Sequence, residues 1–566
     1  MNNKENGFSL VKWFSASLLC LALGGCQTFV PTPALDQRFP EPTLRSDLSR
    51  MVLDPRTEPR IPATIIEDVP STPTALLPGP HMPLTLKDVL YTTLGNNLDI
   101  RISELSRQIS RDQIEQAQGI YDVVARLSTE FQHSLGGSRS YSEDTRTRSW
   151  STSRDVALLA SLSQLMPSGG VASLAYSINR TGSISQSRRK ANGEHTESES
   201  KSIRYLRALT AGVRQPLLRG FGPAVTNAPI KIAQAQAVIS LEAFRQQVMV
   251  ELNQALKAYW DLVFAMNNFD VQKLSLSQAQ DLLRINTIKY ETGMSPQTDV
   301  LQAQAQVASR EELVIRASQQ IQNVMDLLKF SMNIPKDSAQ WGIQFIPQQK
   351  PGFFETDFDE EEAIAEALVK QPLVRQALLG QEINEINRIT AKNNQLPGLD
   401  FTATLGGVSP MADESYEMDN YSVGLEFEYP LQNRAARARY RQALARVDQG
   451  SISIEQARQR VIQSVRLTLR DIETARERID ITQSAVEYET AKLQAEKTRY
   501  DVGISTSFQV LQFQEDFATA QVNYLRAVVD YNKSLLDFEL ARGTMLETFG
   551  VEIEEYGLRA GGPKKP

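Results

Sequence analysis

The residue types that carry catalytic or metal chemistry are few and widely spaced in this chain of 566 residues. The three histidines are His81, His133 and His195, and their spacing matches neither a nucleophile–histidine–carboxylate triad nor a zinc site. The acidic run at 359–362 begins a predicted helix, where carboxylates stabilise the positive end of the helix dipole. The sequence therefore predicts no catalytic residue, no metal site and no cofactor, and it argues against an enzyme.

The two cysteines lie near the N-terminus, where an apolar run over 13–23 is typical of a secretory signal peptide covering residues 1–25. Leu23-Gly24-Gly25-Cys26 resembles the bacterial lipobox, which implies that Cys26 is lipidated with acyl chains such as palmitate; the alternative is an ordinary signal peptide. Gln27, in place of Asp, implies export to the outer membrane. Because Cys20 lies inside the signal, the mature chain keeps no thiol for a disulfide, a metal or a nucleophile.

Two matching segments indicate that the chain is an internal duplication. Tyr290-Glu-Thr-Gly293-Met-Ser295 and Tyr500-Asp-Val-Gly503-Ile-Ser505 are offset by 210 residues. Gln215-Pro-Leu and Tyr429-Pro-Leu are offset by 214, and a weaker helical match pairs Leu98 with Pro372 at an offset of 274. Each half is therefore predicted to run as helix, strands, very long helix, glycine turn and long helix.

Residues 228–292 and 433–502 are the predicted very long helices. Neither contains a proline after Pro229, and at 1.5 Å per residue each would span on the order of 100 Å. Apolar or small residues recur at alternating steps of three and four, which is the pattern of a coiled-coil seam. The seam residues are Val248, Leu252, Ala255, Tyr259, Leu262, Met266 and Phe269, then Val461, Val465, Thr468, Ile472, Ala475, Ile479, Thr482 and Val486.

The strand regions argue against a simple helical bundle. Tyr421, Val423, Leu425, Phe427 and Tyr429 alternate with polar residues or glycine, as a lipid-facing barrel strand requires. The other candidate strands are 123–133, 156–165, 172–178, 203–213 and 399–408, with a tight turn at 167–170. The polar connections 134–153 and 182–201 are expected to be long surface loops. Beyond the signal no apolar run reaches the roughly 18 residues of a membrane-spanning helix, which leaves a closed β-barrel if the chain spans a bilayer.

Together, the duplication, the Tyr-x-x-Gly-x-Ser turns, the sequel Asp299-Val-Leu-Gln-Ala-Gln and the strand exit Gln215-Pro-Leu-Leu-Arg-Gly-Phe-Gly resemble the TolC-type outer-membrane efflux proteins, here a lipoprotein subgroup, over residues 84–550. The resemblance implies a mixed α and β fold that forms, as a homotrimer, a periplasmic α-helical barrel below a transmembrane β-barrel. The first repeat would cover 84–340, with strands about 122–215, and the second 355–550, with strands about 399–430. Six strands per protomer would give eighteen in the trimer; if the hairpin around Pro167 lies outside the barrel, twelve.

The resemblance also implies site residues. In the family, the glycine turns form the periplasmic tip, where the adaptor docks and the exit is gated; here the tip maps to 290–299 and 500–512. Gly293 and Gly503 suit a helix reversal because glycine tolerates positive φ. A family tyrosine–aspartate tie between the two turns carries over to Tyr500 and Asp299.

The chain departs from the family at the tip. Gln509 and Gln512 stand where some relatives place an acidic ring, and Ser505 stands where a basic residue is expected. A ring of glutamines can constrict by hydrogen bonding but attracts cations less than carboxylates do. The sequence therefore predicts weaker cation block than in acidic relatives.

The function implied by the resemblance is an outer-membrane exit duct that receives small molecules from an inner-membrane pump, of the RND or ABC type, through a periplasmic adaptor. The alternatives are a type I protein-secretion duct and a structural periplasmic coiled-coil lipoprotein. The expected location is the outer membrane, in contact with its lipid; the net charge of −7 argues against a nucleic-acid partner. Residues 26–83 are expected to be a lipid anchor and a proline-rich strap, and 551–566 a disordered tail.

Overall fold

The computed structural model describes residues 66–67, 80–551 and 553, with gaps at 144, 192, 339, 354–355 and 411–419. The expected signal peptide, Cys26, most of the strap and nearly all of the tail lie outside these residues. The chain divides into two compact units, residues 62–545 and residues 1–61 with 546–566. The short helix α11 (Met545–Thr548) lies where one unit gives way to the other in sequence.

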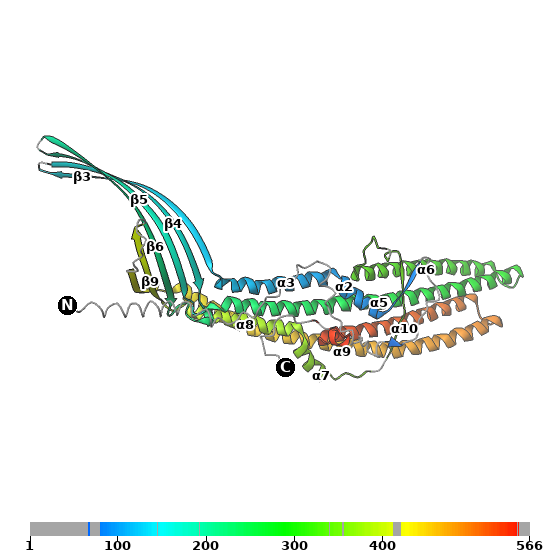
Figure 1. Cartoon of the computed structure of the whole chain (residues 1–566). Coiled ribbons are helices and arrows are strands. Elements are labelled where there is room, and N and C mark those ends of the chain that lie inside the picture. Colours follow the sequence, from blue (N-terminus) through cyan, green and yellow to red (C-terminus); the bar gives the residue numbers. More distant parts are fainter. Residues whose placement is uncertain are drawn as a thin grey trace, which may run out of the picture. The chain divides into compact units, whose positions relative to one another are not determined.

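The helices of the larger unit follow the duplicated order (Figure 1). Those of the first repeat are α2 (Leu86–Asn96), α3 (Leu98–Gln118), the 3-10 turn η4 (Gly119–Tyr121), α4 (Pro223–Thr226), α5 (Ala228–Glu291) and α6 (Gln297–Ser331). Those of the second are α7 (Glu360–Lys370), α8 (Pro372–Asn393), α9 (Arg434–Asp501) and α10 (Ser507–Arg542). Helices α3 and α8 begin at Leu98 and Pro372, which are the positions that the offset of 274 pairs. No helix in the described part of the chain is long and apolar enough to cross a membrane.

Six long strands form one antiparallel sheet in the order β10-β9-β6-β5-β4-β3. They are β3 (Val124–Ser142), β4 (Thr145–Leu165), β5 (Val171–Ala191), β6 (Glu194–Pro216), β9 (Gly398–Pro410) and β10 (Asn420–Glu428). Figure 1 shows β3 to β6 and β9 side by side. The hairpin around Pro167 joins β4 to β5 within this sheet, so it does not lie apart from the other strands. Four short strands make two separate pairs: β1 (Ile66–Glu67) with β8 (Lys350–Pro351), and β2 (His81–Leu84) with β7 (Gln344–Pro347).

The prediction of long surface loops at 134–153 and 182–201 is wrong. The β3–β4 ladder continues without a break to the pair Ser142 and Thr145, and the β5–β6 ladder continues to Ala191 and Glu194. These outer parts of the strands are rich in serine and charged residues on both faces, so they lack the apolar alternation that marks a strand in the sequence. Cross-strand hydroxyl pairs, such as Ser134 with Ser153 at 2.7 Å, contribute to the ladder instead.

The part of the sheet nearest the helices has one face lined by apolar side chains, hereafter the apolar face. Register places Leu127 beside Ala160, Leu158 beside Ile178, and Tyr176 beside Leu209. The remaining members of this face include Phe131, Val156, Leu162, Leu174, Val213, Phe401, Leu405, Tyr421, Val423, Leu425 and Phe427. Alternate residues on the opposite face, such as Arg126 and Ser128, are mostly polar. One face therefore suits lipid and the other suits water.

The helical core lies along α5, whose predicted seam from Val248 to Phe269 is buried. Its largest fully buried side chains are Tyr259 and Trp260, and Tyr531 and Phe538 of α10 are fully buried as well. Two ion pairs of opposite direction connect α5 to α10, each with a nitrogen–oxygen distance of 2.6 Å: Lys257 with Asp537 and Asp261 with Lys533.

A further carboxylate, Glu366, connects α7 to α10. It lies 2.9 Å from Lys370 within α7 and 3.1 Å from Arg542 of α10. The hydrogen bond from Lys370 lowers the pKa of Glu366, partial burial opposes this shift, and the charges of Arg542 and Lys370 add to it. The carboxylate form is therefore favoured where the two helices meet.

Candidate functional site

The two helix reversals, at 292–296 and 502–506, have the same backbone geometry. Gly293 has φ +76° and Gly503 has φ +80°, which are left-handed values that favour glycine. In each reversal the residue directly after the glycine closes a six-residue loop. The Met294 backbone N–H donates to the Lys289 carbonyl at 2.7 Å, and the Ile504 backbone N–H donates to the Arg499 carbonyl at 2.9 Å. This is the helix-ending hydrogen bond of a Schellman motif. Both reversals therefore use the same motif, a left-handed glycine followed by a Schellman hydrogen bond.

A buried hydrogen bond connects the second reversal to the first repeat. Tyr500, at the end of α9, is 7% exposed, and its hydroxyl donates to Oδ1 of Asn286 in α5 at 2.5 Å. Asn286 is 1% exposed, and its Nδ2 donates to the backbone carbonyl of Asp299 at 3.3 Å. The amide thus links three helices, because α9, α5 and α6 each contribute one group.

Apolar contacts and a cation surround this hydrogen bond. The Tyr500 ring packs in a cluster with Leu282, Val510 and Leu511. The ammonium of Lys289 lies 3.7 Å from the centre of the ring, which is a close cation–π contact. Since the site excludes water, the hydroxyl and the amide depend on each other for hydrogen bonding.

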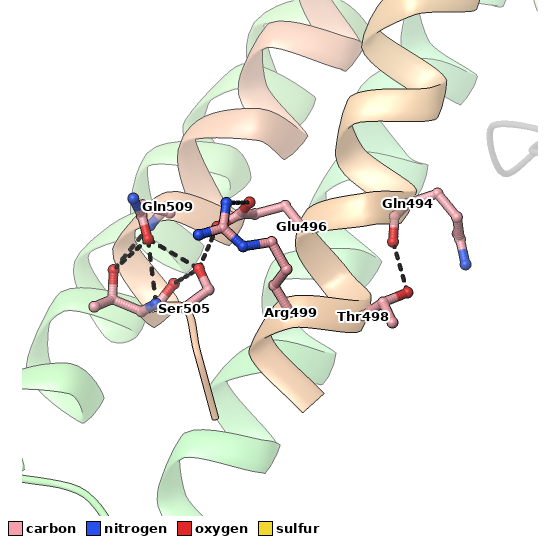
Figure 2. A network of polar contacts seen from close by, with 7 residues as sticks. Gln494, Glu496, Thr498, Arg499, Ser505 and Gln509 are labelled. Atoms are coloured by element: carbon pink, nitrogen blue, oxygen red, sulfur yellow. Dashed lines mark hydrogen bonds and ion pairs between the residues drawn. The ribbon is translucent and has the colours of Figure 1, made fainter. Parts of the chain in front are cut away.

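A second polar network lies within the second reversal (Figure 2). Glu496 of α9 is 3% exposed; its carboxylate accepts a hydrogen bond from the Ser505 hydroxyl and one from Nη1 of Arg499 at 3.2 Å. The Ser505 oxygen also lies 2.9 Å from Oε1 of Gln509. Figure 2 shows Ser505 meeting Glu496 of α9 across the turn, with Gln509 bonded to Ser505 behind it. The buried carboxylate therefore holds the turn against the end of α9.

The offset of 210 relates the two networks. It pairs Asn286 with Glu496, so the two buried polar groups occupy equivalent positions of the repeat. It also pairs Tyr290 with Tyr500, but Tyr290 is 44% exposed while Tyr500 is buried. Within the described residues, Tyr500 is the one of the two tyrosines that is hydrogen-bonded to the other repeat.

The predicted tie between Tyr500 and Asp299 is not formed within the protomer. The Tyr500 hydroxyl donates to Asn286, and the Asp299 carboxylate accepts from the Ser295 hydroxyl at 3.2 Å, close to the start of its own helix. The physical reason is reach: Asn286, one turn before Tyr290 on α5, lies between the two and contacts the backbone of Asp299. Sequence reasoning missed Asn286 and Glu496, although the offset of 210 marks both as equivalent polar positions.

Gln509 and Gln512 both contact neighbours on their own helix. Gln509 forms a capping box with Thr506, in which the Gln509 backbone N–H donates to the threonine hydroxyl at 3.4 Å. Nε2 of Gln512 donates to Oδ1 of Asp516 at 3.0 Å. Both glutamines are exposed. They are therefore accessible for contacts beyond the protomer.

A buried cation lies farther along the same helices. Arg310 of α6 is 4% exposed; its guanidinium donates to the Ser275 hydroxyl of α5 and lies 3.7 Å from Glu515 of α10. Burial lowers the pKa of Arg310, and Glu515 opposes the shift. The side chain nevertheless stays charged, because arginine titrates far above neutral pH.

A family model described as "Outer membrane efflux protein" matches residues 170–332 and 363–544. The outer membrane protein TolC of Escherichia coli is 25% identical over 319 residues, which is 53% of this chain and 62% of that protein. The alkaline protease secretion protein AprF of Pseudomonas aeruginosa is 23% identical over 52% of this chain and 62% of its own length. The chain thus spans less than two thirds of these relatives.

A solved structure shows that the fold is similar over most of the chain. The outer membrane protein VceC of Vibrio cholerae matches with a TM-score of 0.59 at 14% identity, covering 81% of this chain and 96% of that one. At this identity the match concerns the arrangement of helices and strands. The same duplicated mixture of long helices and strands is therefore found in a known outer-membrane protein.

Proposed function

This chain belongs to the outer membrane efflux protein family, and from that premise we propose that it is a lipid-anchored outer-membrane exit duct which passes small molecules out of the cell. The observation that carries the proposal is the six-stranded sheet, with one apolar face and one polar face, in a chain whose helices α5 and α9 run for 64 and 68 residues. A sheet of this kind suits a wall between lipid and a water-filled channel, and the helices suit a periplasmic tunnel.

The edges of the sheet support a homotrimer. Strands β3 and β10 lie at its two ends, and within the described protomer each pairs with a single neighbour. An unpaired edge within a bilayer leaves N–H and C=O groups without partners, so the sheet must close. In the proposal, β10 of one protomer pairs with β3 of the next, and all six strands take part. The barrel then has eighteen strands, which the continuous ladder through the Pro167 turn supports.

We place the gate at the two helix reversals. The buried hydrogen bond from Tyr500 to Asn286 holds the end of α9 against α5, which is the arrangement that keeps the tip narrow. The exposed reversals, including Gly293 and Gly503, would form the docking surface for a periplasmic adaptor, which in turn connects to an inner-membrane pump of the RND or ABC type. Opening would require the Tyr500–Asn286 bond to break in each protomer.

Glutamines at the tip set the expected ion selectivity. Gln509 and Gln512 are exposed and uncharged, so a three-fold ring of either would attract divalent cations weakly. We expect little block by millimolar divalent cations from the periplasmic side. Strong block by divalent cations would contradict a constriction formed by Gln509 or Gln512.

A protein-secretion duct is the second candidate, and the match to AprF, a protein named for alkaline protease secretion, favours it. The structural coiled-coil alternative leaves the apolar face of the sheet without a use. Conductance of the purified full-length protein in planar bilayers separates the channel class from the structural class: small, flickering pores are expected. A folded trimer that gives no pores would contradict the duct. Rescue of protein export, against rescue of drug resistance, in a strain lacking its own duct would separate the two channel functions.

A further inference from the structure

Three arginines form a diagonal row across the apolar face, at the outer limit of its apolar band. They are Arg154 of β4, Arg180 of β5 and Arg207 of β6, hereafter the arginine row. Arg154 pairs with Gly182, two residues from Arg180, and Arg180 pairs with Tyr205, two residues from Arg207. Diagonal neighbours of this kind lie about 7–8 Å apart in an antiparallel sheet.

The direction of the row has a geometric meaning. Strands of a barrel tilt by about 35–45° from its axis, so positions at one height above the membrane follow a diagonal across the strands. The row advances by two residues per strand, always in the same sense. The three guanidinium groups therefore lie near a single level of the barrel wall.

The band on the inner side of the row is uncharged. Val156, Ile178 and Leu209 are the next residues of this face toward the helices. In the described strands, no carboxylate occupies this face from the row inward, on any of β3, β4, β5, β6, β9 and β10. The carboxylates of the same face lie farther out, at Glu197 and Glu199, where each already pairs with a cation.

Aromatic side chains lie at the level of the row and beyond it. Nε of Arg180 donates to the hydroxyl of Tyr205 at 3.2 Å, and the guanidinium lies 5.8 Å from the centre of that ring. Trp150, 42% exposed, lies on the same face of β4 beyond the row, four residues farther out than Arg154. Tyrosine and tryptophan gather at the two surfaces of a bilayer around transmembrane barrels. The row therefore lies where the apolar lipid chains end and the headgroups begin.

From this geometry we propose that the arginine row binds the phosphate groups of a phosphorylated lipid in the outer leaflet. The inference rests on the proposed function, because it takes the apolar face as the outside of a membrane-spanning barrel. Arginine suits the role because its planar guanidinium donates two parallel hydrogen bonds to a phosphate. The apolar band below the row contacts the acyl chains of the same lipid, so one lipid molecule binds both the arginine row and the apolar band.

The test uses the full-length trimer in detergent, with native mass spectrometry counting bound lipid. The probes are a diphosphorylated lipid A and its dephosphorylated form. The double variant Arg154→Gln and Arg180→Gln should bind the phosphorylated probe about tenfold or more weakly, since each basic residue near a charged membrane surface contributes about 1 kcal/mol. The matched control, Arg126→Gln with Arg204→Gln, removes two exposed arginines from the opposite face of the sheet and should bind it as the wild type does.

Three results would overturn the proposal: equal binding by both double variants, equal binding of the two probes by the wild type, or full displacement of the lipid by millimolar inorganic phosphate, which would indicate a simple anion site. Conductance of the same preparations separates this inference from the duct. Pores with no preference for the phosphorylated probe would contradict the arginine row alone. A phosphate preference without pores would support the row and contradict the duct.

Discussion

Replacing Tyr500 with phenylalanine removes one hydroxyl and nothing else from the tip. The ring can stay packed against Leu282, Val510 and Leu511, so the apolar cluster should survive. What is lost is the 2.5 Å hydrogen bond to Asn286, a residue that is 1% exposed and cannot replace its partner with bulk water. We therefore expect Tyr500→Phe to weaken the contact between α9 and α5 without unfolding either helix.

The magnitude follows from burial. A buried polar group that loses its partner costs about 1–3 kcal/mol. If the bond exists only in the narrow state of the tip, the opening equilibrium shifts by roughly 5- to 150-fold per protomer, because 1.36 kcal/mol is a factor of ten. Single-channel recording should show a correspondingly larger open fraction for Tyr500→Phe than for the wild type.

Tyr290→Phe is the matched control, since it makes the same substitution at the equivalent position of the first repeat, where the side chain is 44% exposed. Its open fraction should stay near that of the wild type. Equal open fractions for the two variants, or a wild-type open fraction for Tyr500→Phe, would refute the reasoning from burial.

Other substitutions test the local geometry. Gly293→Ala and Gly503→Ala should each destabilise the purified protein by about 1–2 kcal/mol, because an added Cβ meets no atom within 4 Å and the cost comes from positive φ alone; thermal melting that is unchanged for either would contradict this. Gly380→Ala, with open space around the added Cβ, should stabilise the protein by about 1 kcal/mol, and Gly450→Ala should stabilise it less, because the flexible Gln381 side chain of α8 must first turn away from the new Cβ; a melting temperature that rises more for Gly450→Ala than for Gly380→Ala would refute the contrast. The pKa of Glu366 is lowered in the folded chain, so its stabilisation is present above the ordinary carboxyl pKa and is lost as pH falls through the folded value. The melting-temperature gap between wild type and Glu366→Gln should therefore narrow from pH 6 to pH 4, and a gap that widens would contradict the sign.

The long helices could be predicted from the sequence because their signal is repeated many times. A seam of apolar residues at steps of three and four continues from Val248 to Phe269, and every one of its seven members is buried. The glycine turns were equally clear, since positive φ restricts the residue type at Gly293 and Gly503. Both the helical seam and the glycine turns depend on residues close together in the sequence, so both can be predicted from it.

The outer strands and the tip contacts could not be predicted in the same way. Serine-rich strands that are polar on both faces look like loops, and only their pairing shows that they are strands. Tyr290 and Tyr500 stand in the same motif, yet Tyr290 is exposed and Tyr500 is buried, because burial depends on long-range contacts such as the packing of Tyr500 against Leu282. Asn286 on a coiled-coil helix would ordinarily be read as solvated. Its role depends on contacts between residues more than 200 positions apart.

The most direct test of a gate at the tip is to fix α5 and α9 together and measure conductance. Cysteines introduced as Asn286→Cys and Tyr500→Cys can be joined by a short, cleavable thiol crosslinker, since the natural cysteines are only Cys20 and Cys26. We expect wide pores before crosslinking, narrow pores after it, and wide pores again once the link is cleaved. Pores whose conductance is the same in all three states would contradict a gate at the tip.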